Sequence, residues 1–153
     1  MNPQAAHYTL MGLETLSLRM QRHCDNAMKI ATWLEEQETV EAVTYAGLKS
    51  SPYFDRVKKV CPKGAGGLFT VALKGGYDSC IKFVNALEIF SHVSNLGDSR
   101  SLVIHTASTT HRQLTVEQQI AAGSAPNVVR ISIGIEDPDD LMADLKQALA
   151  TAK

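Results

Sequence analysis

The stretch covering residues 127–149 constrains the fold more than any other, because it reads as a strand followed directly by a helix. Branched apolar residues alternate with polar or small ones over residues 129–136, which is the two-residue period of a strand with one buried face. Asp137 is then placed to cap a helix whose first turn contains Pro138. The pattern predicts a strand that enters a helix without a linker.

Arg130 lies on the polar face of this predicted strand, and two interpretations of it are open. In the first, the side chain points to solvent or pairs with a neighbouring carboxylate. In the second, it binds a planar anion, because the small Ser132 and Gly134 on the same face leave room beside the guanidinium. A carboxylate matches the two-pronged geometry of a guanidinium. The residues of this strand alone do not decide between these interpretations.

The length and composition predict one ordinary globular domain with a hydrophobic core, since 44% of the 153 residues are apolar and 20% are charged. The net charge is −1, and positively and negatively charged residues are interspersed along the chain. We therefore expect no binding to nucleic acid or to an anionic membrane surface. No segment approaches the roughly 18 apolar residues of a membrane span, and no leader pattern opens the chain. We therefore expect a cytoplasmic protein.

Cysteines and histidines give no sign of a disulfide framework or a metal site. The three cysteines are far apart and odd in number, which favours a reducing compartment. The five histidines form no H-x-x-x-H pair and have no cysteine at ligand spacing. We expect no metal ligands among them.

The remaining hydrophobic periodicity predicts an α+β fold, in which helices pack on a small, largely antiparallel sheet. A long amphipathic helix over about residues 10–37 either links two domains or wraps one core, and the pattern supports both equally. Asp78 is a candidate helix cap. Further strands are expected over residues 40–45, 68–74, 90–94 and 102–105, and further helices over residues 53–60 and 116–122.

Four stretches carry a resemblance to a known family. They are G-L-E-T-L-S-L-R-M-Q-R-H-C-D-N-A from Gly12, P-K-G-A-G-G from Pro62, S-N-L-G-D-S-R-S-L-V-I-H-T-A-S-T-T-H from Ser94, and V-R-I-S-I-G-I-E-D-P-D-D-L from Val129. Together they resemble the Cys/Met metabolism family of pyridoxal phosphate (PLP) enzymes, the transsulfuration enzymes. Within it, the chain is most similar to the O-acetylhomoserine sulfhydrylases. Cystathionine gamma-synthases and methionine gamma-lyases are the near alternatives.

The resemblance implies the small C-terminal domain of the aspartate-aminotransferase-like PLP-dependent transferase fold. Residues 1–37 would include a helix that links to a large PLP-binding domain, which this chain lacks, and residues 38–153 would form the α+β domain. The complete enzyme would be a homo-oligomeric transferase of methionine and cysteine biosynthesis. It would convert O-acetylhomoserine and sulfide to homocysteine and acetate, with PLP as cofactor.

The resemblance also implies which residues bind the amino-acid substrate. The arginine of the family's V-R-x-S-x-G motif clamps the substrate α-carboxylate, and it falls on Arg130. Asn95 stands where the family often has serine in its S-L-G turn, and Thr110 is the threonine of its T-H ending. Both are expected to help at the same carboxylate.

The family's PLP lysine belongs to an S-x-[ST]-K type motif, and no lysine of this chain lies in one. We therefore expect no catalytic and no cofactor-binding residues here, and no activity from the chain alone. The chain would then be a fragment, a truncated product or one half of a split enzyme. An alternative of another class is a stand-alone, non-catalytic domain that binds an amino acid or a partner protein.

Overall fold

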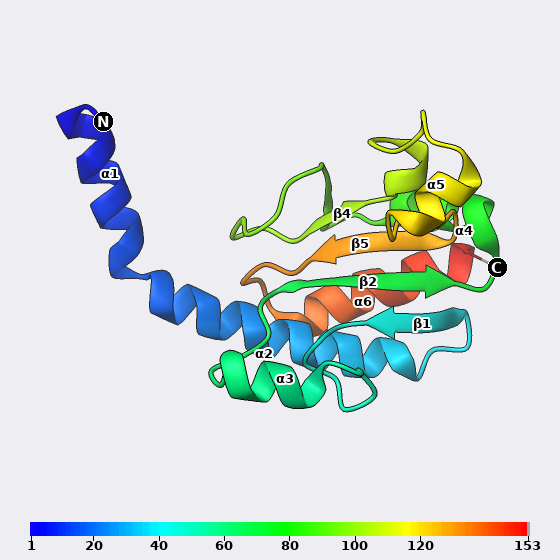
Figure 1. Ribbon diagram of the computed structural model, residues 1–153, viewed down its shortest axis with the longest axis horizontal. Coiled ribbons are helices and arrows are strands. Elements are labelled where there is room, and N and C mark those ends of the chain that lie inside the picture. The colour runs from blue at the N-terminus through cyan, green and yellow to red at the C-terminus, as the bar shows by residue number, and fades with distance from the viewer. Residues whose placement is uncertain (153) are drawn as a thin grey trace.

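A computed structural model describes residues 1–152 as helices packed on a single sheet (Figure 1). The elements are α1 (Pro3–Glu14), α2 (Leu16–Glu35), β1 (Val40–Thr44), α3 (Phe54–Val60), β2 (Leu68–Leu73), α4 (Gly76–Ala86), β3 (Ser91–His92), β4 (Leu102–Ile104), the 3-10 helix η1 (Thr106–Ser108), α5 (Val116–Ala121), β5 (Val128–Ser132) and α6 (Pro138–Thr151). This order of elements confirms the predicted mixture of helices and strands.

The five strands form one sheet in the order β1-β2-β5-β4-β3. Every neighbouring pair is antiparallel except β3 with β4, so the predicted largely antiparallel sheet is confirmed. The strand that contains Arg130 is the central one. Its register places Arg130 opposite Thr70 of β2 on one side and Ile104 of β4 on the other.

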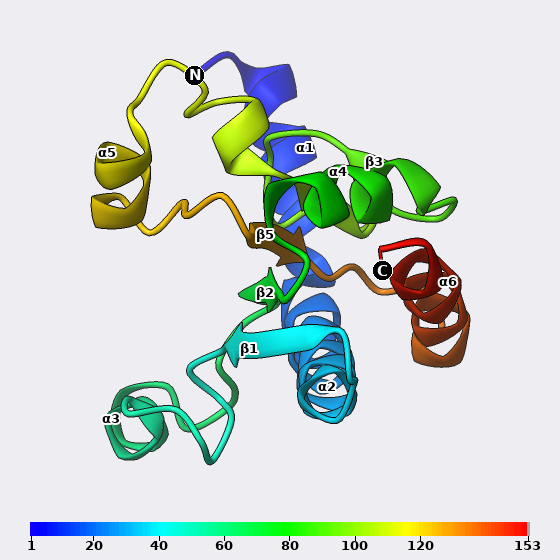
Figure 2. The same cartoon turned by 90° about the vertical axis from the view of Figure 1, so that its right-hand side faces the viewer.

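The core lies on the face of β5 that carries Val129 and Ile131, both of which are fully buried. Helices α2 and α4 contact the strands, and α6 contacts both of these helices. Figure 2 shows these three helices on one side of the sheet, with α3 and α5 toward the other. Because side chains alternate along a strand, Arg130 points away from the α2, α4 and α6 layer.

The long N-terminal helix differs from the prediction in two ways. It begins at Pro3 instead of near residue 10, and it is interrupted at Thr15, where α1 ends and α2 begins. Only the part of α2 beyond Met20 is buried against the core, whereas α1 has no buried residue and projects from the body (Figure 1). The expected apolar stripe is therefore only partly used, since Leu13 and Leu16 are exposed.

Helix boundaries follow local capping signals, with one exception. Asp137 accepts a hydrogen bond from the Asp139 amide at 2.8 Å, and Thr115 forms the predicted capping box with Gln118. Asp78 does not cap α4, because the helix starts earlier, at Gly76. Gly76 has a φ of +73°, a conformation that favours glycine and allows the chain to turn before Asp78.

No helix among residues 1–152 combines the length and apolar character that a membrane crossing needs. The same residues contain no group of three or more His, Cys, Asp or Glu placed to hold a metal ion. Cys24, Cys61 and Cys80 are all free thiols.

Candidate functional site

Arg130 is half-buried on the central strand, and its Nη2 donates a hydrogen bond to the backbone oxygen of Asn95 at 3.3 Å. Two ion pairs are present within residues 1–152, Lys29 with Asp139 and Arg100 with Asp98, and neither involves Arg130. The described part of the chain therefore offers Arg130 no carboxylate partner. A guanidinium held on a rigid strand without a counter-charge is suited to an external anion.

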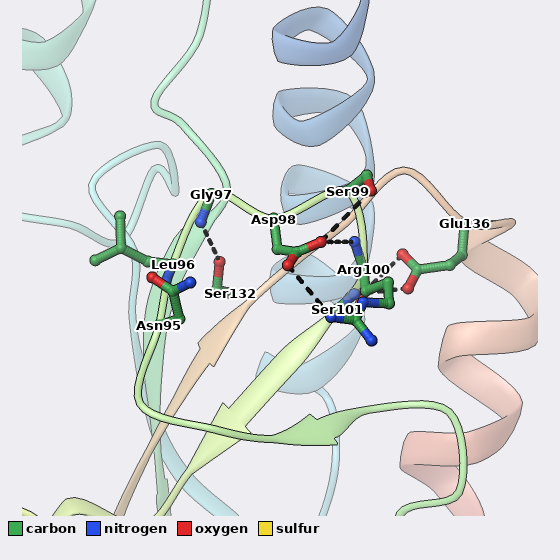
Figure 3. A network of polar contacts seen from close by, with 9 residues as sticks. All are labelled: Asn95, Leu96, Gly97, Asp98, Ser99, Arg100, Ser101, Ser132 and Glu136. Carbon is green, nitrogen blue, oxygen red and sulfur yellow. Dashed lines mark hydrogen bonds and ion pairs between the residues drawn. The ribbon is translucent and has the colours of Figure 1, made fainter. Parts of the chain in front are cut away.

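The turn over residues 95–101 belongs to the β3–β4 connection (Figure 3). It contacts Arg130 through the backbone oxygen of Asn95. Asn95 Oδ1 accepts a hydrogen bond from the Leu96 amide at 2.9 Å, while its side-chain nitrogen has no hydrogen-bond partner in residues 1–152. The Gly97 amide donates to Ser132 Oγ at 3.2 Å. The structure thus brings Arg130 into contact with the backbone of Asn95.

The space beside Gly134 is occupied by protein, which corrects the idea that this glycine leaves room for an anion. A Cβ at Gly134 would lie 2.4 Å from the Ser99 backbone oxygen and 2.6 Å from the Arg100 carbonyl carbon. The regular strand ends at Ser132, earlier than predicted, although the Ile133 amide still donates to the Gly67 oxygen and the Ile135 amide to the Ser99 oxygen in the register of the two ladders. A glycine is required at position 134 because the turn packs directly against its Cα.

Within residues 1–152, no hydrogen bond joins Thr110 to the other two predicted residues. Its exposed hydroxyl is 2.9 Å from His111 Nδ1, and the structure records no contact between it and Arg130 or Asn95. The loop that carries it is nevertheless fixed, since Gln119 donates to the backbone oxygens of Ala107 at 3.2 Å and His111 at 3.0 Å. Among the described residues, Thr110 therefore has a fixed loop but no hydrogen bond to Arg130.

His105 is a buried polar residue that the sequence reasoning did not single out. Its Nε2 lies 2.9 Å from the Pro126 carbonyl, which only accepts, so we assign the proton to Nε2. Nδ1 then accepts from the Ser108 hydroxyl at 2.9 Å. Burial lowers the pKa of His105, more strongly than the Pro126 hydrogen bond raises it. The neutral ring therefore ties the start of the Thr110 loop to the segment that leads into β5.

A small cavity of about 230 Å³ lies next to the turn. It is formed by α2, by the residues at the adjacent ends of β2 and β5, and by the turn itself. Its walls are predominantly apolar and consist of Met20, His23, Gly67, Leu68, Leu96, Gly97, Ser132 and Ile133. Leu96 and Gly97 thus belong both to this cavity and to the turn whose first residue contacts Arg130.

Comparison with known proteins identifies the family. The model of the Cys/Met metabolism PLP-dependent enzymes matches residues 1–150. The chain belongs to this family. It is 47% identical over 150 residues to O-acetyl-L-homoserine sulfhydrylase 1 of Thermus thermophilus, covering 98% of this chain and 36% of the relative. Methionine gamma-lyase of Pseudomonas putida is 42% identical over 149 residues, which cover 97% of this chain and 37% of that relative.

The fold comparison agrees with the sequence comparison. A Campylobacter jejuni protein assigned as an O-acetylhomoserine (thiol)-lyase matches with a TM-score of 0.89 at 42% identity, over 97% of this chain and 35% of that one. Its crystal structure carries N'-pyridoxyl-lysine-5'-monophosphate. The chain spans about a third of the length of the curated relatives it matches.

The family uses PLP, but the lysines within residues 1–152 do not suit the cofactor. A lysine that forms a Schiff base works as a neutral amine, which desolvation in a pocket favours. All eight lysines within residues 1–152 are exposed, namely Lys29, Lys49, Lys58, Lys59, Lys63, Lys74, Lys82 and Lys146. We therefore assign no residue described here to the cofactor and derive no chemical step from it.

Proposed function

We propose that this chain is the substrate-carboxylate-binding domain of a PLP-dependent O-acetylhomoserine sulfhydrylase. The complete enzyme would form homocysteine and acetate from O-acetylhomoserine and sulfide, and PLP with its lysine would lie outside this chain. The observation that carries the proposal is Arg130, a half-buried guanidinium on the central strand with no acidic partner in residues 1–152. The identity to sulfhydrylases supports the choice of reaction.

Arg130 and Asn95 would bind and orient the substrate. The guanidinium donates two parallel hydrogen bonds to a carboxylate, and the unpaired amide nitrogen of Asn95 adds a third donor. Holding the carboxylate on a strand and a fixed turn sets the direction of the rest of the amino acid. Thr110 would join this site if its hydroxyl, which lies 2.9 Å from His111 Nδ1, rotated toward the carboxylate.

We also propose that α1 and the first part of α2 join residues 38–153 to a large PLP-binding domain. The support is the exposure of apolar side chains along α1, of which Tyr8 is 61% and Leu10 63% exposed. An isolated helix without any buried residue gains nothing from tertiary packing, so contact with a further domain accounts for its composition.

The test is a chimaeric enzyme in which this chain replaces the matching region of the Thermus thermophilus relative. Arg130→Ala should raise KM for O-acetylhomoserine about 10- to 150-fold, the range that corresponds to a charged hydrogen bond of roughly 1.5–3 kcal/mol. Arg130→Lys keeps the positive charge but cannot donate two parallel hydrogen bonds to one carboxylate. Its KM should therefore lie between those of the unmodified chimaera and Arg130→Ala.

An Arg130→Ala chimaera with unchanged KM and turnover would refute the carboxylate assignment. Binding of O-acetylhomoserine by the chain alone, measured by calorimetry without PLP, would instead support the stand-alone binding domain.

A further inference from the structure

We propose that Glu136 is a positioning residue for the carboxylate site, because its carboxylate fixes the turn that orients Arg130. This inference rests on the proposed role of Arg130 and extends it to a residue that does not touch the substrate. Glu136 follows β5 and lies on the far side of the turn from Asn95 (Figure 3).

The carboxylate of Glu136 uses both of its oxygens on a single residue of the turn. The Ser101 amide donates to Oε1 at 2.6 Å, and the Ser101 hydroxyl donates to Oε2 at 2.9 Å. The same hydroxyl oxygen accepts from the Gly134 amide at 2.9 Å. Ser101 is fully buried, so water cannot replace these partners, and hydrogen bonds to an ionised acceptor are the stronger kind.

Helix α2 holds the backbone of Glu136. The backbone oxygen of Glu136 accepts from Asn26 Nδ2 at 2.9 Å and from Arg22 Nη2 at 3.3 Å. Asn26 is buried and also donates to the Gly134 oxygen at 3.2 Å. The carboxylate therefore extends from a backbone that is itself anchored, which makes Glu136 a rigid link between α2 and the turn.

The position of the turn determines the direction of Arg130. The recorded hydrogen bond of Arg130 goes to the Asn95 oxygen, at the opposite end of the turn from Ser101. Without the Glu136 carboxylate, the hydrogen bonds from Gly97 to Ser132, from Ile135 to Ser99, and from Gly134 and Ser91 to Ser101 would remain, but the buried Ser101 amide would lose its acceptor. Loss of the Glu136 link would thus let the turn shift while the strand beneath Arg130 stays in place.

The first experiment measures amide hydrogen exchange in the chain itself. Glu136→Ala should speed exchange of the Ser101 and Gly134 amides about tenfold or more, while amides of α6 keep their rates. Glu136→Gln should restore most of the protection, because its amide oxygen still accepts from the Ser101 amide and its nitrogen can donate to the Ser101 hydroxyl. Glu14→Ala, at an exposed position of α1, is the matched control.

The second experiment measures KM and kcat in the chimaeric enzyme. Glu136→Ala should raise KM for O-acetylhomoserine about tenfold with kcat within about twofold, and Glu136→Gln should recover most of it. A merely structural role would lower the amount of active enzyme and leave KM unchanged. If Arg130→Ala raises KM but Glu136→Ala changes neither KM nor exchange, the positioning role is wrong. If Arg130→Ala has no effect, the proposed function itself is wrong.

Discussion

Replacing Gly134 with alanine tests whether this glycine serves the turn or the ligand. The added methyl carbon would lie 2.3 Å from Glu136 Oε2, 2.4 Å from the Ser99 oxygen and 2.6 Å from the Arg100 carbonyl carbon. Two of these atoms are backbone, so a side-chain rotation cannot remove the clash. The turn itself must move away from the strand.

The magnitude follows from these contacts. Forcing a methyl group into a packed site costs about 1–3 kcal/mol. Displacing the turn also weakens the bonds from Ile135 to Ser99 and from Gly134 to Ser101, which are worth about 0.5–1.5 kcal/mol each. Overpacking alone should lower the melting temperature by roughly 2–12 °C for a domain of this size. Thermal unfolding followed by circular dichroism measures this shift.

Gly12→Ala is the matched control, since a Cβ at Gly12 in α1 meets no atom within 4 Å. It should leave the melting temperature unchanged or raise it slightly, because alanine favours a helix over glycine. Wild-type stability of Gly134→Ala together with weaker amino-acid binding would refute the packing argument. It would restore the view that this glycine leaves space for the anion.

Two further predictions concern buried groups. Because burial lowers the pKa of His105, the unfolded chain takes up a proton below about pH 6.5 that the folded chain does not, so the unfolding free energy should fall as pH drops from 7 to 5. His105→Asn should flatten this dependence in urea titrations at the two pH values. Burial raises the pKa of the Cys80 thiol to about 12, so a thiol reagent at pH 8 should label the exposed Cys61 in the native state and Cys80 only after unfolding.

Local signals in the sequence predicted most of the elements. The cap at Asp137, the capping box at Thr115 and the alternation in β5 each act within a few residues, so a linear pattern contains them. The break at Thr15 had a weaker local signal, with Gly12 nearby and a hydroxyl residue able to start a new helix. The sequence pattern of α2 also continued through this break, so a single helix was expected.

The contacts that build the site are not local, which is why sequence reasoning missed them. Glu136 and Ser101 belong to different segments, and neither has a motif that joins them. Gly134 was interpreted from its own strand, whereas the atoms that require a glycine come from the turn at Ser99. The family resemblance predicted that Asn95 and Arg130 act at one site, whereas the hydrogen bond from Arg130 to the Asn95 backbone became evident only from the structure.

Because β5 occupies the centre of the sheet but follows the other four strands in the sequence, the sheet cannot close until β5 has left the ribosome. Until then β2 has an unpaired edge on the side that β5 will fill, where Phe69 and Val71 will lie beside Ile131 and Val129. Such edges pair with other chains. Folding of this domain during synthesis therefore depends on late insertion of a middle strand, a non-local step that is intrinsically slow.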